Sequence, residues 1–297
     1  MARPDPPPDE AWPDACLVKE TSTLKERWSV LIVLCMVTAR SSAMGFNRII
    51  DRDIDAKNPR TATRELPSGQ ISLTAAWAFT LGSAALFVLF SGLLGWLTLA
   101  LSPIAIAVIW GYSLTKRFTA LCHLVLGVAL ALAPTAVWIA ITGSYDWTPF
   151  VLSVAVATWV AGFDVLYSLQ DREFDSGEGL HSMPQALGET GAMVASGVLH
   201  VVTVGCLAAL PFLTPLGWPY WIGFAVITAV LAYEHWLVRP GDLSRIDKAF
   251  FDLNGYVSVA FFVFVLGSLC RAYLRRLSED ALGQDHQARR RVVGHGL

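Results

Sequence analysis

Long apolar runs constrain the fold of this chain more than any other feature of its sequence. A helix that crosses a bilayer needs about 17 to 25 mostly apolar residues, and eight runs meet that requirement. They cover approximately residues 29–47, 73–95, 96–112, 119–142, 148–170, 191–212, 217–237 and 252–273. The apolar residues are continuous, whereas a transmembrane barrel would need them to alternate with polar ones. We therefore predict an all-α, polytopic membrane protein, a bundle of eight spanning helices.

Composition supports a location in the lipid bilayer. The chain is 54% hydrophobic and 15% charged, with a mean hydropathy of +0.51, which is too apolar for a soluble domain of 297 residues. No basic stripe interleaved with aromatic residues is present, so we expect no nucleic-acid partner. The five cysteines contain no CxxC pair, which argues against a disulfide framework or a zinc site.

The ends of the chain differ from its apolar middle. Residues 1–28 are rich in proline and acid, and we predict a disordered head there. This head lacks the basic start and apolar core of a signal peptide. Residues 29–274 form the predicted transmembrane domain, and residues 275–297 form a charged tail.

A run of charge follows directly on the first apolar run, from Asn47 to Gly69 (NRIIDRDIDAKNPRTATRELPSG). Asn47, Asp51 and Asp55 are four residues apart, so on a helix they share one face. Asp53 falls on the opposite side of the same turn and is a weaker candidate.

The same arrangement returns in residues 162–175 (GFDVLYSLQDREFD), where one helical face carries Asp164, Tyr167, Asp171 and Asp175. Each acidic cluster closes an apolar helix that runs toward the same membrane face, which is a weak internal repeat. Two such clusters would repel one another unless a cation lay between them. Mg²⁺ is the natural candidate, because it is held by one or two carboxylates together with substrate phosphates.

Basic residues accompany both clusters. Arg40 lies seven residues before Asn47 and on roughly the same helical face, and an ionisable group inside a membrane helix is a functional candidate by default. The alternative is that Arg40 pairs with a carboxylate to fix packing. Arg60 and Arg64 follow the first cluster, and Tyr112 and Lys116, four residues apart, end the third run on the same side. Such bases suit a metal diphosphate, although each could instead be a cytoplasmic topology anchor.

Two further segments carry weaker predictions. Residues 176–191 (SGEGLHSMPQALGETG) are polar and rich in glycine, which favours a lid or binding loop. Within this segment, His181 is a candidate for proton transfer, but a single histidine in a loop is more often simply solvated. Asp252 and Asn254 are expected to cap the last span.

These motifs resemble the UbiA superfamily of intramembrane aromatic prenyltransferases. Asn47-x3-Asp51-x3-Asp55 is similar to the first aspartate motif of that family and Asp171-x3-Asp175 to the second, while Tyr112-x3-Lys116 is similar to a shorter signature. NPRTATRELPSG together with GFDVLYSLQD looks most like 4-hydroxybenzoate polyprenyltransferases and their relatives in the futalosine route to menaquinone.

The resemblance implies an activity and a set of site residues. The activity is Mg²⁺-dependent transfer of a polyprenyl group from its diphosphate to an aromatic acid, of the 4-hydroxybenzoate or dihydroxynaphthoate type, in ubiquinone or menaquinone biosynthesis. The implied catalytic residues and metal ligands are Asp51, Asp55, Asp171 and Asp175. The implied substrate-binding residues are Arg40, Asn47, Arg60, Arg64, Tyr112, Lys116, Asp164 and Tyr167.

The resemblance also implies nine spans around a cavity open to lipid, with the aspartates on the cytoplasmic side of a bacterial inner membrane. This chain shows eight apolar runs rather than nine. The span that is missing by comparison with the family usually precedes the helix that ends in the first motif. We expect either that the natural chain is longer or that one wall of the cavity is missing or supplied in another way. Two alternatives remain open: a membrane transporter, since carriers also have intramembrane carboxylates and repeats, and a non-catalytic relative that lacks the first helix.

Overall fold

The computed structural model describes residues 14–239, 241–243, 245–248 and 252–294. Within these residues the chain is almost entirely helical, with no β-strand and a single β-bridge between Arg239 and Asp242. The predicted all-α class is therefore confirmed. Residues 1–13 of the predicted head lie outside the described residues, and the predicted domain boundaries stay predictions.

Eight long helices coincide one for one with the eight predicted runs. They are α1 (Asp14–Ile50), α3 (Leu73–Leu94), α4 (Trp96–Thr115), α5 (Cys122–Thr142), α6 (Trp147–Tyr167), α8 (Met183–Leu213), α9 (Trp218–Leu237) and α11 (Asn254–Gly294). By length and composition, seven helices of the described part can cross a membrane, and α9 is not among them. Its tryptophans, Glu234 and His235 lower its mean hydropathy, so the predicted count of eight spans holds only approximately.

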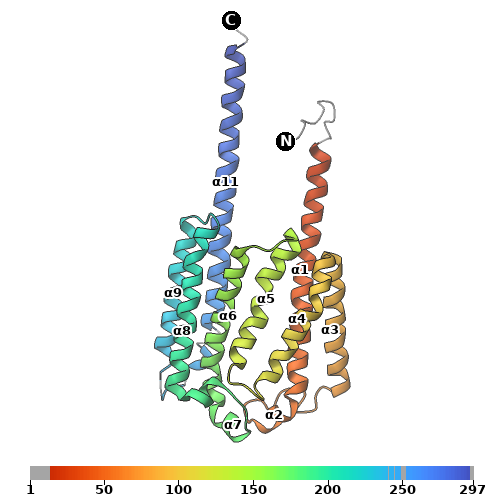
Figure 1. Cartoon of the computed structure of the whole chain (residues 1–297), viewed down its shortest axis with the longest axis vertical. Helices are drawn as coiled ribbons and strands as arrows, with labels where there is room; N and C mark the ends of the chain where they lie inside the picture. Colours follow the sequence, from red (N-terminus) through yellow and green to blue (C-terminus); the bar gives the residue numbers. More distant parts are fainter. Residues whose placement is uncertain (1–13, 240, 244, 249–251, 295–297) are drawn as a thin grey trace, which may run out of the picture. The chain divides into compact units, whose positions relative to one another are not determined.

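Short helices follow two of the long ones. The six-residue helix α2 (Arg52–Lys57) comes after α1. A 3-10 turn, η1 (Ser168–Asp171), and the six-residue helix α7 (Arg172–Gly177) come after α6. A final short helix, α10 (Ile246–Lys248), precedes α11. Both predicted aspartate motifs therefore lie where a long helix gives way to a short one (Figure 1).

The chain forms two compact units. Unit 1 contains Met1–Trp110 and Ala136–Tyr145, and unit 2 contains Gly111–Thr135 and Asp146–Leu297. The helices α4 and α5 each contribute residues to both units. The first aspartate motif belongs to unit 1 and the second to unit 2.

Close packing of α1 against α3 fixes the end of α1 in unit 1. Gly45 permits this approach, since a Cβ atom there would collide with Thr80 Oγ1. One residue later, the Phe46 ring stacks on Trp110 with a centroid distance of 4.7 Å. Trp110 Nε1 also donates a hydrogen bond of 3.0 Å to Ser42 Oγ. Small residues and interhelical hydrogen bonds are the usual means of holding membrane helices together, and here they act within two turns of Asn47.

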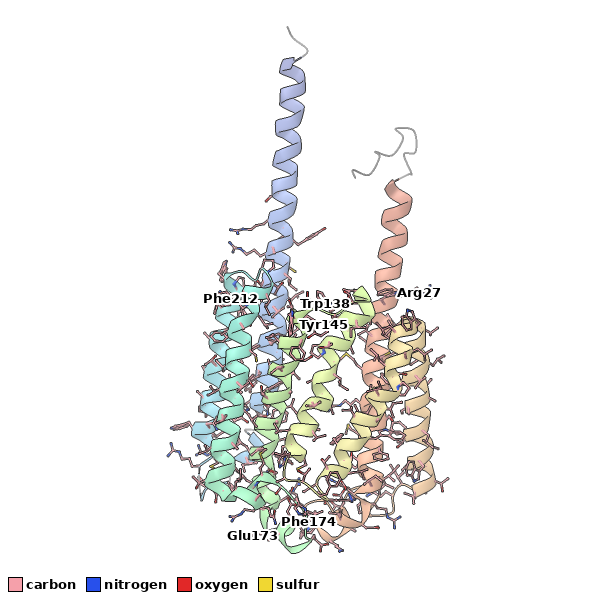
Figure 2. The ribbon with its side chains drawn as sticks, viewed as in Figure 1. Arg27, Trp138, Tyr145, Glu173, Phe174 and Phe212 are labelled. Carbon is pink, nitrogen blue, oxygen red and sulfur yellow. The ribbon has the colours of Figure 1, made fainter. Side chains whose placement is uncertain are left out.

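In unit 2, α6 is the central helix. A Cβ atom at Gly127 of α5 would collide with the carbonyl oxygen of Ala157, and one at Gly162 would collide with the His200 ring of α8. Ser196 Oγ of α8 donates a 2.7 Å hydrogen bond to Gly162 O. Figure 2 shows α7, labelled by Glu173 and Phe174, at the end of this unit opposite Phe212 of α8. The close contacts on both sides of α6 hold the helix that leads into the second aspartate motif.

The predicted loop at residues 176–191 is wrong for most of its length. α7 continues to Gly177 and α8 begins at Met183, so residues 178–182 connect them, and a kink at Gly188 (φ 71°, ψ 176°) then interrupts α8. Ser182 caps α8 by accepting a hydrogen bond of 3.4 Å from Gln185 N, and Pro184 lies in the first turn. This cap and proline are a helix-start signal that the polar, glycine-rich composition concealed. We call residues 178–182 the connecting segment.

The start of the last helix also differs from its prediction. A π-helical turn at Asp252 and Leu253 precedes α11, and Asn254 is the first residue of α11. The side-chain oxygen of Asn254 accepts a 3.0 Å hydrogen bond from Trp159 Nε1 of α6. Asn254 thus joins α11 to α6.

Candidate active site

The first aspartate turn joins α1 to α2. Asp51, the residue between the helices, has φ −93° and ψ 4°. Helical hydrogen bonds nevertheless continue across it, from Asp51 N to Asn47 O (2.9 Å) and from Asp55 N to Asp51 O (2.7 Å). Asn47 Nδ2 donates a hydrogen bond of 3.0 Å to Asp51 Oδ2. The structure therefore brings Asn47 and Asp51 together on one face, as their spacing predicts.

Arginine holds the carboxylate of Asp55, which is only 7% exposed. Arg64 Nη1 donates to both carboxylate oxygens at 2.8 Å, and Arg48 Nη1 lies 3.9 Å from Oδ2. Thr61 Oγ1 donates to the Asp55 carbonyl oxygen at 3.1 Å, which ties the following loop to this residue. Charge-assisted hydrogen bonds of this kind are among the strong ones, so the protein balances the charge of Asp55 and gives each of its carboxylate oxygens one donor.

The other candidates of unit 1 are more exposed. Arg40 and Arg60 both lie at exposed positions, and Arg60 N donates a 3.0 Å hydrogen bond to Asn58 Oδ1. The side chain of Asp53 is 89% exposed and lies 3.5 Å from Arg52 Nε. This agrees with its position on the opposite side of the turn and makes it a useful control residue.

The second aspartate turn repeats the backbone of the first. Asp171 has φ −96° and ψ 0°, and it precedes a six-residue helix whose fourth residue is Asp175. Asp51 precedes a six-residue helix whose fourth residue is Asp55. In both turns the second aspartate is buried. The weak repeat seen in the sequence is therefore also a repeat of local conformation.

Asp175 has a different electrostatic environment from Asp55. Its side chain is 0% exposed, and Lys116 Nζ lies 2.7 Å from Oδ1. Lys116 balances the charge as an ion-pair partner, but among the described residues neither carboxylate oxygen has a hydrogen-bond partner. A fully buried carboxylate usually has several such partners. Asp175 therefore keeps acceptor sites that a hard cation can use.

The residues present fit Mg²⁺ only if water and substrate phosphates supply part of its coordination shell. Nowhere in the described parts of the chain do three histidine, cysteine or acidic side chains come close enough to hold a metal ion on their own. Mg²⁺ is usually held by one or two carboxylates and completes its octahedral shell with water and substrate phosphates. The orphaned oxygens of Asp175 match that kind of coordination.

The connecting segment lies against Lys116. His181 N donates a 2.8 Å hydrogen bond to Lys116 O, and Leu180 N donates one of 2.9 Å to Asp175 O. Lys116 itself follows the end of α4, one helical turn after the half-buried Tyr112. The backbone thus holds Lys116 and Asp175 on either side of the connecting segment, while the exposed His181 side chain takes no part in these bonds.

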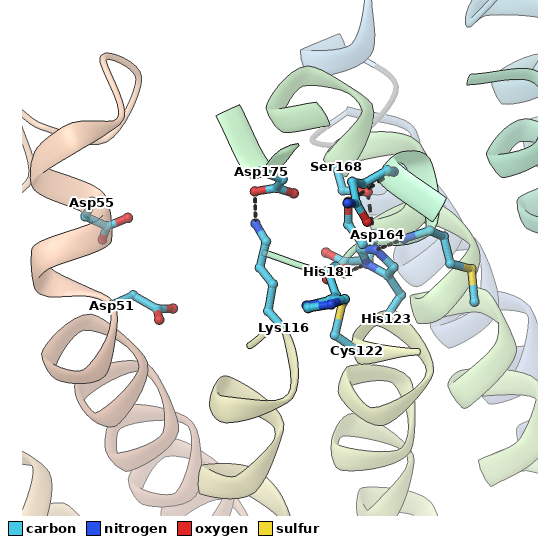
Figure 3. A network of polar contacts seen from close by, with 12 residues as sticks. Asp51, Asp55, Lys116, Cys122, His123, Asp164, Ser168, Asp175 and His181 are labelled. Carbon is cyan, nitrogen blue, oxygen red and sulfur yellow. Dashed lines mark hydrogen bonds and ion pairs between the residues drawn. The ribbon is translucent and has the colours of Figure 1, made fainter. Parts of the chain in front are cut away.

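Asp164 has a partner that the sequence analysis did not select. His123 Nδ1, from α5, lies 2.6 Å from Asp164 Oδ2 of α6 (Figure 3). The signal for His123 was present, because it is an ionisable residue near the start of an apolar run. Its contact with a residue 41 positions later was not readable from the sequence. Tyr167, the last residue of α6, is half-buried and packs against the core formed by Val165, Leu166 and Leu169.

Comparison with known proteins gives a consistent result. The sequence model of the UbiA prenyltransferase family matches residues 15–267. A 4-hydroxybenzoate octaprenyltransferase of Vibrio campbellii is 31% identical over 262 residues, which are 87% of this chain and 90% of that protein.

Solved structures show the same fold. The apo structure of a UbiA homologue from Aeropyrum pernix K1 is 31% identical, with a TM-score of 0.76 over 82% of this chain and 90% of that one. A UbiA homologue from Archaeoglobus fulgidus bound to DMAPP and Mg²⁺ is 19% identical, with a TM-score of 0.60 over 80% of this chain and 88% of that one.

Proposed function

This chain belongs to the UbiA prenyltransferase family, and on that premise we propose that it transfers a polyprenyl group from its diphosphate to an aromatic acid, with Mg²⁺ as the cation. The proposed acceptor is of the 4-hydroxybenzoate or dihydroxynaphthoate type, and the product serves ubiquinone or menaquinone biosynthesis. The observation that carries the proposal is the repeated aspartate turn, in which Asp55 and Asp175 are both buried beside a base. The name of the Vibrio relative supports the acceptor class.

The four aspartates of the turns are the proposed metal ligands: Asp51, Asp55, Asp171 and Asp175. When bound, Mg²⁺ would act as a Lewis acid that neutralises the charge developing on the diphosphate leaving group. In this role Asp175 offers carboxylate oxygens that accept no hydrogen bond from the described residues. Asp55 is already paired with Arg64, so the first contribution of Arg64 is to fix the orientation of this carboxylate.

Basic and polar side chains act on the substrates directly in this proposal. Lys116 and Arg60 donate to diphosphate oxygens, and Arg40 binds the carboxylate of the aromatic acid. Asn47, whose amide is held by Asp51, orients the acceptor ring. The ring proton leaves to a carboxylate or to the released diphosphate once the new carbon–carbon bond has formed.

Two tyrosines protect the reacting carbon. Tyr112 and Tyr167 are half-buried and belong to the same unit as the second aspartate turn. We propose that they exclude water and stabilise the allylic cation by cation–π attraction, which contributes about 0.5 to 2 kcal/mol per ring. In this proposal Asp164 either binds substrate or hydrogen-bonds to the residues that bind substrate and metal. The enzyme would work in the bacterial cytoplasmic membrane, with both aspartate turns on the cytoplasmic side.

The first test is an activity assay on membranes that contain this chain. Geranyl diphosphate and Mg²⁺ are supplied with a panel of acceptors that includes 4-hydroxybenzoate and a dihydroxynaphthoate, and products are identified by mass spectrometry. We expect a prenylated acid that disappears with EDTA and in the Asp51→Asn and Asp171→Asn variants. Absence of any product, in a preparation that is folded, would instead favour a non-catalytic relative.

A further inference from the structure

His123 connects three other segments of unit 2. The imidazole is 3% exposed and lies in the first turn of α5. Its Nδ1 is 2.6 Å from Asp164 Oδ2 of α6. Its Nε2 is 3.4 Å from Ser168 Oγ of η1 and 3.4 Å from Met183 N, the first residue of α8. One ring therefore contacts the helix before the second aspartate turn, the turn itself and the helix after it.

The hydrogen-bond roles are compatible with these contacts in either protonation state of the ring. Nδ1 carries a proton and donates it to Asp164 in both states. An unprotonated Nε2 accepts from Met183 N, which can only donate. A protonated Nε2 donates instead to Ser168 Oγ, whose own proton goes to Val165 O at 2.8 Å. In both cases His123 stays bonded to α6 on one side and to a later segment on the other.

The connecting segment reaches the same place through its backbone. Cys122 Sγ donates to His181 O at 3.5 Å, next to His123 in the chain. The neighbouring backbone bonds run from His181 N to Lys116 O and from Leu180 N to Asp175 O. The start of α5 therefore supports the backbone from Asp175 to Met183, which carries the buried carboxylate at one end (Figure 3).

We infer that His123 is a positioning residue that holds the second aspartate turn and its connecting segment in the conformation in which Asp175 meets Lys116. The catalytic meaning of this role rests on the proposed function, because only a diphosphate-binding site needs that conformation. Substitution of a residue that holds a metal ligand in place typically weakens metal binding about 10- to 100-fold. His123 acts through Asp164 and the backbone, so we expect an effect near the lower limit.

Three substitutions of His123 distinguish the contact of Nδ1 with Asp164 from the contacts of Nε2. His123→Asn keeps a donor at the position of Nδ1 for Asp164 but does not reach α8. His123→Gln places its amide oxygen near the position of Nε2, where it accepts from Met183 N, but loses Asp164. His123→Phe removes both contacts at similar volume. Tyr220→Phe is the matched control, because Tyr220 of α9 is also 3% exposed and lies in unit 2, where its hydroxyl donates a 2.6 Å hydrogen bond to Leu207 O.

Hydrogen–deuterium exchange of the full chain in detergent tests the positioning role without any assumption about substrate. Amides in the peptide of residues 172–187 should exchange about tenfold faster in His123→Phe than in the wild-type protein. They should exchange at intermediate rates in the Asn and Gln variants of His123 and at the wild-type rate in Tyr220→Phe. If His123→Phe fails to fold, the Asn and Gln variants carry the test. Wild-type exchange in this peptide for every folded His123 variant would overturn the inference.

Binding of inorganic diphosphate with Mg²⁺ tests whether the positioning role of His123 matters for the proposed active site. We expect about tenfold weaker binding in His123→Phe, partial recovery in His123→Asn or His123→Gln, and wild-type binding in Tyr220→Phe. Faster local exchange with unchanged binding would contradict the link between His123 and the site. Failure of the wild-type protein itself to bind Mg²⁺ and diphosphate would overturn the proposed function, and the exchange measurement would then still decide the role of His123.

Discussion

The two aspartate turns have nearly the same backbone and very different surroundings. Asp51 and Asp171 differ by only a few degrees in φ and ψ, and each precedes a six-residue helix with a buried aspartate at its fourth position. In the first turn, Arg64 donates to both oxygens of that aspartate. In the second, a lysine is close, but the carboxylate oxygens accept no hydrogen bond from any described residue.

This difference indicates how the two turns are stabilised. The first turn is complete within the protein, because a planar guanidinium satisfies the geometry of a carboxylate. The second turn holds a buried charge whose compensation is incomplete, and such a charge is costly unless a further cation arrives. We therefore expect the first turn to be rigid without ligands and the second to depend on Mg²⁺ and diphosphate. The four predictions below test that contrast.

The largest effect is expected from Asp175→Asn. This change removes the buried charge with its orphaned oxygens, so kcat/KM for geranyl diphosphate should fall about 10²- to 10³-fold. Without Mg²⁺ the variant should melt close to the wild-type protein, because the lost ion pair with Lys116 is offset by removal of a buried charge whose oxygens accept no hydrogen bond from the described residues. Asp53→Asn, at an exposed position of the other turn, is the control and should keep wild-type activity. Full activity in Asp175→Asn would exclude this residue from the site.

The effect of ligands on stability should come next. A ligand present at a hundred times its Kd stabilises the folded protein by about 2.7 kcal/mol. Mg²⁺ and diphosphate at such concentrations should therefore stabilise a protein that binds them. We expect the melting temperature of the wild-type protein in detergent to rise accordingly, and that of Asp175→Asn to rise little. Exchange protection gained on binding should be concentrated in residues 171–183 rather than 51–64. Equal gains in both turns would contradict the contrast drawn above.

A paired experiment on the two bases sharpens the comparison. Arg64→Ala removes hydrogen bonds to a buried charged group, which should lower the free energy of unfolding by about 1.5 to 3 kcal/mol. Lys116→Ala also leaves a buried carboxylate without its ion-pair partner. Added Mg²⁺ and diphosphate should recover most of the stability lost in Lys116→Ala and little of that lost in Arg64→Ala. Recovery in both variants, measured by thermal unfolding, would show that both turns depend on the cation.

The smallest effect should follow from Asn47→Ala. This change removes one side-chain hydrogen bond to Asp51, which corresponds to about 0.5 to 1.5 kcal/mol. Because the backbone bonds around Asp51 remain, we expect near-wild-type folding and a moderate loss of activity. Asn47→Asp, which places a second carboxylate beside Asp51, should be worse than Asn47→Ala in the same assay. The opposite order would argue that Asn47 acts through its side-chain oxygen, which aspartate also supplies.

Local spacing predicted the parts of the site that lie within one helical face. Asn47 and Asp51 meet because residues four apart on a helix are neighbours, and the opposite position of Asp53 follows from the same geometry. The apolar runs predicted all eight long helices, since chain length and hydrophobicity decide which segments can cross a bilayer.

Pairings between distant residues could not be predicted in this way. Arg64 reaches Asp55 through a loop whose course depends on Thr61 and Asn58. The contact between His123 and Asp164 depends on how α5 packs against α6, which Gly127 controls by permitting a close approach. The error at residues 176–191 had a different origin: the cap at Ser182 was outweighed by a composition typical of loops.

The connecting segment is attached by its backbone, and that has a consequence for how such a chain can change over generations. The bonds from Leu180 N, His181 N and Met183 N use main-chain groups, so the exposed side chains of Glu178 and His181 can be substituted without removing these bonds. An inserted or deleted residue cannot be absorbed, because it would shift all three donors out of register with Asp175, Lys116 and His123. Among descendants of this sequence, the number of residues from Asp175 to Met183 should therefore be retained longer than the identity of the exposed residues between them.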